Sequence, residues 1–231
     1  MSQTKDDLIA LDLDGTLEDS RQDMVASVHR VRQTLDLAAM TDADVWPHVN
    51  RGMEHLYRTC FRERFSGDAT TDQEQLQMLA DTYETDYGAH IVDHTRLYDG
   101  MKHALQELYP MGHLAVVTNK PEQLSIKLLE HLGVRHLFSA IIGGDTCHEA
   151  KPSAIPYAEA ASRCNFRSPR GQAFMIGDTA GDVKCGRAFG AVTIWCAWGY
   201  AEGPGDQEPH LRAGHPSELP GLIQNQLNTS R

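Results

Sequence analysis

Four aspartates, a threonine and a lysine stand at or just beyond the ends of apolar runs in four separate segments of this sequence. These residues are Asp12, Asp14, Thr118, Lys151, Asp178 and Asp182. Carboxylates can hold a divalent cation and attack phosphorus, while a hydroxyl and an ammonium group can bind the phosphate oxygens. Taken together, the set predicts a metal-dependent phosphoryl-transfer site.

The first two aspartates have spacing suited to divided catalytic roles. Asp12 ends an apolar run, and we expect it to be the nucleophile that attacks phosphorus. Asp14 follows two residues later, so an extended backbone places both side chains on the same side of the chain. Asp14 is therefore the candidate acid that protonates the leaving oxygen and the base that then activates water.

A cation is required because an anionic nucleophile must approach an anionic phosphate. Mg²⁺ prefers oxygen ligands, and we expect the Asp12 carboxylate, the Asp14 backbone carbonyl and Asp178 to provide them. Asp182 lies one helical turn after Asp178 and is the fourth candidate in the metal site. Two roles are open for Asp182, holding a metal-bound water or holding Lys151.

Several side chains are candidates for binding the substrate. Thr118 and Asn119 end an apolar run and can donate hydrogen bonds to phosphate oxygens, and Lys151 supplies positive charge. Lys120 either adds charge near the site or is an exposed lysine at a helix start. Arg51 either reads a carboxylate or second charged group of the substrate or is a solvated loop arginine.

Composition narrows the classes of protein to which this chain can belong. The chain has 231 residues, a hydrophobic content of 41% and a formal net charge of -11. The acidity argues against a nucleic-acid partner but is compatible with a small phosphorylated metabolite.

We expect no membrane segment, a cytoplasmic location and reduced thiols, because the start of the chain lacks a secretory pattern and the five cysteines are scattered. A monomer or homodimer is expected.

The apolar runs alternate with helical patterns and predict an α/β fold with a doubly wound parallel sheet. Strands are expected at 8–11, 113–117, 140–142, 173–176 and 191–195, and helices at 101–109, 122–132, 153–164 and 182–189. Ligands bind at the carboxyl ends of strands in such sheets, which is where the polar motifs fall.

Residues 20–96 interrupt this alternation and predict an inserted helical domain, leaving 1–19 and 97–231 as the core. Helices are expected at 24–35, 42–49, 53–61 and 76–87. Ser20 and Asp23 predict an N-cap pairing for the first of them. The tail from Gly203 to Pro220 is rich in glycine, proline and charge and predicts a loop.

The six polar residues match, in order, the four motifs of the haloacid dehalogenase superfamily, which this chain resembles over nearly its whole length. That resemblance implies a Rossmann-like core with an inserted α-helical cap domain. It also favours phosphoryl chemistry over dehalogenation, because the dehalogenases of that superfamily typically lack an aspartate at the position of Asp14. Segments 12–20, 117–121, 143–146 and 198–200 are most similar to phosphoglycolate phosphatases.

The resemblance implies Mg²⁺-dependent hydrolysis of small phosphomonoesters, with 2-phosphoglycolate as the expected substrate. Three alternatives stay open. One is a phosphatase acting on pyrophosphate, a nucleotide or a sugar phosphate. Another is a phosphomutase similar to β-phosphoglucomutase, and the last is a non-catalytic binding protein with the same fold.

Overall fold

The computed structural model describes residues 6–49, 51–167 and 171–229. The chain forms two compact units. One unit contains the residues up to Asp19 together with those from Leu97 onward, and the other contains Ser20–Arg96. Within the described residues, no helix is both long enough and apolar enough to span a membrane.

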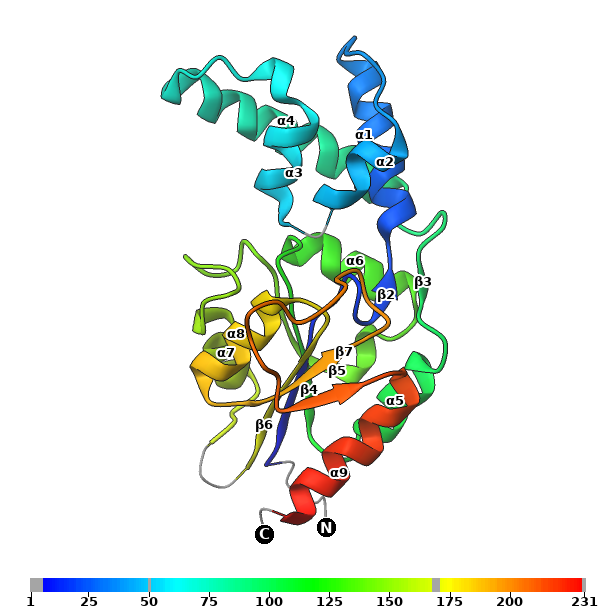
Figure 1. The fold of residues 1–231 in the computed structure, drawn as a ribbon, viewed down its shortest axis with the longest axis vertical. Helices are drawn as coiled ribbons and strands as arrows, with labels where there is room; N and C mark the ends of the chain where they lie inside the picture. The colour runs from blue at the N-terminus through cyan, green and yellow to red at the C-terminus, as the bar shows by residue number, and fades with distance from the viewer. Residues whose placement is uncertain (1–5, 50, 168–170, 230–231) are drawn as a thin grey trace. The chain divides into compact units, whose positions relative to one another are not determined.

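The first unit is built on a six-stranded parallel sheet (Figure 1). The central strand, β1, is completely buried, which explains its uninterrupted apolar sequence. In spatial order the strands are β5 (Phe138–Ile142), β4 (His113–Val117), β1 (Leu8–Leu11), β6 (Ala173–Gly177), β7 (Val192–Cys196) and β8 (Leu211–Ala213). This parallel sheet confirms the predicted α/β fold class.

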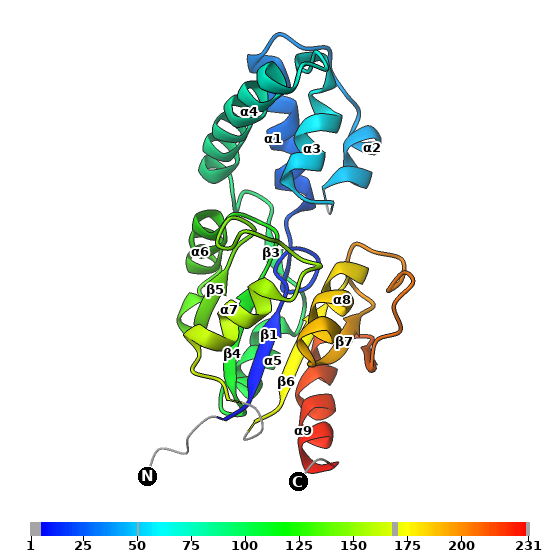
Figure 2. The ribbon, with the colours of Figure 1, turned by 90° about the vertical axis from the view of Figure 1, so that its left-hand side faces the viewer.

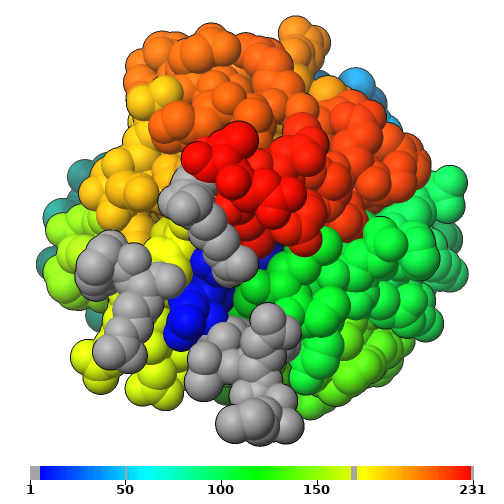
Figure 3. All heavy atoms as spheres, turned by 90° about the horizontal axis from the view of Figure 1, so that it is seen from below, coloured from blue at the N-terminus to red at the C-terminus, as the bar shows by residue number. Residues whose placement is uncertain are grey.

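Helices cover both faces of the sheet. On one face, α7 (Ile155–Arg163) and α8 (Ala180–Phe189) pack on strand residues such as Ala10 and Met175 (Figure 1). On the other side, α5 (Met101–Leu108) packs against α9 (Leu219–Thr229) (Figure 3). The remaining helical segments of this unit are α6 (Glu122–His131), η3 (Arg135–Leu137) and η4 (Pro216–Glu218).

The strand register brings the polar motifs to one edge of the sheet. Leu11 is paired with Val116 on one side and with Ile176 on the other. Asp12 follows Leu11 directly, and its backbone N–H donates to the Ile176 carbonyl at 2.9 Å. The segments that follow β4 and β6 therefore begin beside Asp12 at the carboxyl end of the sheet.

The prediction of a loop from Gly203 to Pro220 is wrong for part of that segment. β8 pairs in parallel with β7, and α9 begins at Leu219. The strand was hard to recognise because it has three residues and lies at the sheet edge, where only Ala213 is buried. A separate two-stranded sheet contains β2 (Glu18–Asp19) and β3 (Arg96–Leu97).

The second unit is helical, and its α-helices each overlap a segment where periodicity predicted a helix, whereas the short segment 62–64 was not predicted (Figure 2). Tyr83 lies at its centre, donates to the Met24 carbonyl at 3.1 Å, and packs against the rings of Tyr57 and Tyr87. The helical segments are α1 (Arg21–Thr34), α2 (Asp42–Val45), η1 (Trp46–His48), α3 (Met53–Cys60), η2 (Arg62–Arg64) and α4 (Ala69–Ala89).

The predicted N-cap pairing of Ser20 with Asp23 is wrong. Ser20 makes no side-chain cap, and its hydroxyl instead contacts the Met24 sulfur at 3.6 Å. The buried Asp23 carboxylate accepts from the backbone N–H groups of His94 and Thr95, at 3.0 and 2.8 Å. Burial explains the difference, because an enclosed carboxylate needs these donors and a local turn pattern does not reveal them.

Candidate active site

Asp12 is enclosed at the carboxyl end of β1. Its side chain lies 2.6 Å from the Lys151 ammonium group. Burial, followed by the negative charge of Asp182, raises the pKa of Asp12 to about 8, although Lys151 acts in the opposite direction. The structure thus places the predicted nucleophile in direct contact with the predicted phosphate-binding lysine.

Lys151 bridges two carboxylates. Its ammonium nitrogen lies 2.6 Å from one oxygen of Asp12 and 2.6 Å from one oxygen of Asp182. Burial lowers the pKa of Lys151, but the two carboxylates outweigh this effect and the net shift is upward. Lys151 therefore stays positively charged at neutral pH.

The backbone of Lys151 is fixed by Asn119. The Asn119 amide donates to the Lys151 carbonyl at 3.2 Å and accepts from the Lys151 backbone N–H at 3.0 Å. These contacts join the segment after β4 to the loop after β5. Sequence reasoning assigned Asn119 only to phosphate binding, which stays a prediction, and missed this structural contact.

Asp178 follows β6, and its two oxygens have separate donors. One oxygen accepts from the Thr16 hydroxyl at 3.2 Å, and the other accepts from the Tyr200 backbone N–H at 2.7 Å. Burial, followed by the charge of Asp182, raises the pKa of Asp178 to about 6. Its carboxylate is held in one orientation by the loops that follow β1 and β7.

The turn around Asp178 leaves no room for larger residues at two glycines. Gly15 has a φ of +80°, and a Cβ there would lie 2.7 Å from an Asp178 oxygen. A Cβ at Gly199 would lie 2.5 Å from the Gly15 carbonyl and would also overlap Asp178. These small residues let two loops close on the carboxylate.

Asp182 is held at the start of α8. One oxygen accepts from the Thr179 backbone N–H at 2.9 Å and from its hydroxyl at 2.7 Å, forming a capping box. The other oxygen contacts Lys151 at 2.6 Å. This geometry supports the second of the two roles left open for Asp182, holding the lysine.

The carboxylates fit a divalent cation. One oxygen from each of Asp12, Asp178 and Asp182 lies within 4.8 Å of the others, and all three residues are buried. With Asp14, the site has four carboxylates, and among the described residues the ammonium groups of Lys120 and Lys151 contact them. Burial is the largest cause of the raised pKa values of Asp12 and Asp178, and the charge of Asp182 raises both further. A divalent ion on hard oxygen ligands would offset the excess negative charge.

Thr118 and Asp14 are linked through Lys120. The Thr118 hydroxyl oxygen accepts from the Lys120 backbone N–H at 3.2 Å, which leaves its own hydrogen able to donate. The Lys120 ammonium lies 2.6 Å from an Asp14 oxygen. Lys120 is buried, so the alternative of an exposed lysine at a helix start is wrong. Its place three residues after the end of β4 was the available sequence signal.

Arg51 belongs to the helical unit. It is exposed, lies between η1 and α3, and its backbone N–H donates to the His48 carbonyl at 3.3 Å. Burial, followed by the charges of His55 and Arg51, lowers the pKa of His48. The role of Arg51 in reading a substrate stays a prediction.

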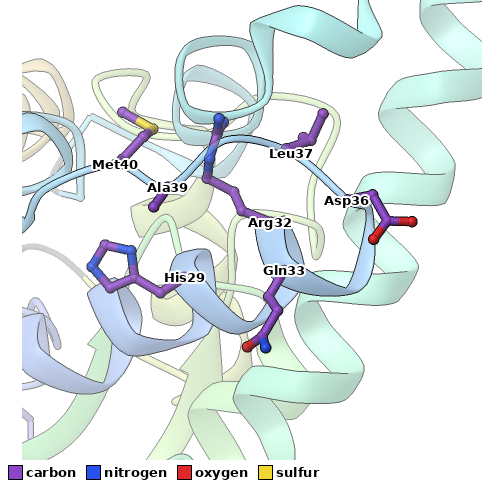
Figure 4. A pocket seen from close by; sticks show the side chains of 7 residues that line it. All are labelled: His29, Arg32, Gln33, Asp36, Leu37, Ala39 and Met40. Atoms are coloured by element: carbon purple, nitrogen blue, oxygen red, sulfur yellow. The ribbon is translucent and has the colours of Figure 1, made fainter.

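The helical unit also contains a hollow of about 610 Å³ between the C-terminal part of α1 and residues 36–40 (Figure 4). Two charged or titratable side chains of its lining have partners within the unit. Arg32 donates to the Ala38 carbonyl and to Glu63, and His29 lies 2.7 Å from Asp42. We assign no ligand to this hollow.

Comparison with known proteins shows a family and several relatives to which this chain is similar. The model of the haloacid dehalogenase-like hydrolases matches residues 9–196. The phosphoglycolate phosphatase of Chromobacterium violaceum is 34% identical over 195 residues, covering 84% of this chain and 86% of the relative. The phosphoglycolate phosphatase of Aquifex aeolicus is 29% identical over 221 residues, covering 95% and 98%.

Solved structures share the fold. A protein of Haemophilus somnus, called a predicted phosphoglycolate phosphatase, superimposes with a TM-score of 0.79 at 22% identity, covering 96% of this chain and 100% of that one. A haloacid dehalogenase-like hydrolase of Streptococcus pneumoniae gives 0.77 at 23% identity, with the same coverage. The sequence match over residues 9–196 establishes the relationship, and this chain belongs to the haloacid dehalogenase-like hydrolase family.

Proposed function

We propose that this protein is a Mg²⁺-dependent phosphatase that hydrolyses small phosphomonoesters through a phosphoaspartyl intermediate on Asp12. The observation that carries the proposal is the contact of Lys151 with Asp12 beside the buried carboxylate of Asp178. The names of the curated relatives favour 2-phosphoglycolate as the substrate, with glycolate and phosphate as products.

The first step forms a bond between an Asp12 oxygen and phosphorus as the bond from phosphorus to the substrate oxygen breaks. Lys151, already in contact with Asp12, holds the phosphoryl group against the nucleophile. The Thr118 hydroxyl donates to a non-bridging oxygen. Asp12, Asp178 and the Asp14 backbone carbonyl would hold Mg²⁺, which neutralises charge on the phosphoryl group and the nucleophile.

Asp14 acts as the general acid in the first step and as the general base in the second. It gives a proton to the leaving oxygen when the phosphoaspartate forms, which releases the alcohol product. It then takes a proton from the water that attacks phosphorus, the bond from phosphorus to the Asp12 oxygen breaks, and the step regenerates the Asp12 carboxylate and releases inorganic phosphate. Asp182 keeps Lys151 in place throughout, through the 2.6 Å ion pair.

The experiment is a measurement of phosphate release across small phosphomonoesters with Mg²⁺ or with a chelator. The panel contains 2-phosphoglycolate, pyrophosphate, a nucleotide and sugar phosphates. We expect Mg²⁺-dependent release that is greatest with 2-phosphoglycolate and absent from Asp12→Asn. An isomerised sugar phosphate in place of free phosphate would identify a mutase, and no turnover of any substrate would favour a binding protein.

The helical unit is proposed to act as the cap, with Arg51 binding the substrate carboxylate. Arg58, on α3 of the same unit, is exposed and paired with Glu54, and it provides a matched control. Arg51→Ala should raise KM for 2-phosphoglycolate about tenfold or more, as expected for a lost charged contact, while Arg58→Ala should not. Equal kinetics for the two variants would remove Arg51 from the substrate site.

The remaining proposals concern the class of binding partner, the cellular location and the oligomeric state. The substrate is a small phosphorylated metabolite, and the acidic chain is unsuited to a nucleic-acid partner. A cytoplasmic location and a monomeric or homodimeric state are proposed from the sequence. Fractionation and analytical ultracentrifugation test these two points.

A further inference from the structure

Lys120 is a buried lysine whose ammonium group is aimed at one catalytic carboxyl group. Only 3% of Lys120 is exposed, and its nitrogen lies 2.6 Å from Asp14 Oδ1. A buried ammonium group must be compensated by charged or polar partners. Asp14 supplies such a partner, so the pair is a constructed part of the site.

The backbone of Lys120 is fixed at both of its polar groups. Its N–H donates to the Thr118 hydroxyl at 3.2 Å, and its carbonyl accepts from the Gly144 N–H at 3.0 Å. Asn119, the preceding residue, is held by the Lys151 backbone. The lysine therefore extends from a rigid base toward Asp14.

Asp14 is followed by a turn that a backbone bridge to Glu18 closes. Gly15 has a φ of +80°, and the chain bends there toward β2. The rotamer of the Asp14 side chain therefore depends on the contacts that its carboxyl group makes, including the one with Lys120. A charge-assisted hydrogen bond from a fixed lysine restricts the rotation of a carboxyl group.

We propose that Lys120 is a positioning residue that orients the Asp14 carboxyl group for proton transfer to the leaving oxygen. This inference rests on the proposed phosphatase function. Proton transfer needs heavy atoms within hydrogen-bond reach, so a small displacement of Asp14 slows the step that depends on it. Lys151, not Lys120, contacts the nucleophile.

The leaving group provides a selective test. The leaving group of 2-phosphoglycolate is a strongly basic alkoxide unless it is protonated as the bond breaks. The leaving group of p-nitrophenyl phosphate is p-nitrophenolate, a weak base that needs little protonation. Lys120→Met keeps an unbranched side chain of nearly the same length and removes its charge. We expect kcat/KM for 2-phosphoglycolate to fall about 100-fold, in line with the loss of general acid catalysis, and kcat/KM for p-nitrophenyl phosphate to fall about threefold or less.

Four further variants complete the design. Lys120→Arg, which keeps a charged donor, should recover most of the activity with 2-phosphoglycolate. Asp14→Asn should show the same dependence on the leaving group, and adding Lys120→Met to it should cause little further loss. Lys127→Met, at an exposed lysine of α6, should behave as the unaltered protein.

Two results would overturn the inference. Equal losses with both substrates and a raised KM would make Lys120 a phosphate ligand, and no loss with either would leave it without a role in catalysis. If Lys120→Met does not fold, as judged by circular dichroism, Lys120→Gln takes its place in the same comparison. The unaltered protein is assayed first, so absence of Mg²⁺-dependent turnover would identify failure of the proposed function itself.

Discussion

The Asn119 side-chain amide and the Lys151 backbone form two hydrogen bonds, of 3.2 and 3.0 Å, in opposite directions. The pair fixes the loop after β5 against the end of β4. Because Lys151 carries the ammonium group between Asp12 and Asp182, this backbone contact sets where the positive charge of the site lies.

Removing the Asn119 amide should therefore impair catalysis through Lys151. Asn119→Ala removes two hydrogen bonds worth about 1 kcal/mol each, and we expect kcat/KM to fall about tenfold or more. Steady-state kinetics provide the measurement, and a melting curve checks that the variant is folded. Unchanged kinetics in a folded variant would show that the loop keeps Lys151 in place without this contact.

The raised pKa of Asp12 predicts a pH-dependent difference in stability between two metal-free proteins. In the folded state this carboxyl group keeps its proton up to about pH 8, whereas the ordinary pKa is 3.8. Between these values the folded state binds more protons than the unfolded state, so the free energy of unfolding falls as pH rises. Asp12→Asn lacks this contribution.

In chelator, the Tm of Asp12→Asn minus that of the unaltered protein should therefore increase from pH 5 to pH 8 and level off above the folded pKa. The difference between the two proteins reports the titration of Asp12 together with its coupling to the charged groups that contact it, and the groups remote from the site cancel. Differential scanning calorimetry supplies the values. A difference that stays flat across this range would contradict the placement of Asp12 in a buried, negatively charged site.

Mg²⁺ should stabilise the folded protein through Asp178. Saturation at about 100 times the dissociation constant adds about 2.7 kcal/mol, which calorimetry detects as a rise in Tm. Asp178→Asn should lose most of this rise. A full Mg²⁺ response in that variant would place the ion elsewhere.

Gly199 should be intolerant of a side chain. A Cβ there would overlap Asp178 and lie 2.5 Å from the Gly15 carbonyl, whereas a Cβ at Gly203 meets nothing within 4 Å. Gly199→Ala should therefore weaken Mg²⁺ binding about tenfold or more by displacing the Asp178 carboxylate, while Gly203→Ala should not. Isothermal titration calorimetry of both variants gives the comparison, and equal affinities would show that the loop moves aside.

Much of the sheet could be predicted because its strands carry a strong local signal. β1 is buried on both faces and reads as a continuous apolar run, and Asp12 marks its end. The short edge strand β8 and helix α9 were missed, since a three-residue, partly exposed strand has no such pattern. An apolar pattern in the sequence reflects the burial of side chains, and elements at the edge of a sheet bury fewer of them.

The contacts that orient the site were less predictable. Lys120 and Asp14 are 106 residues apart in sequence, and Asn119 and Lys151 are 32 apart. Residue type alone could not distinguish a buried lysine paired with a carboxylate from an exposed one at a helix start. Such pairings depend on which loops meet at the sheet edge, and that information comes from the tertiary fold.

The most direct test of the central claim is the capture of a phosphoryl group on Asp12. The enzyme is mixed with Mg²⁺ and a substrate carrying a radiolabelled phosphoryl group, quenched in acid during the first turnover, reduced with borohydride and digested for mass spectrometry. We expect a base-labile label on the protein and reduction of Asp12 to homoserine, with neither in Asp12→Asn. Rapid turnover without any protein-bound label, or a label on another residue, would contradict Asp12 as the nucleophile.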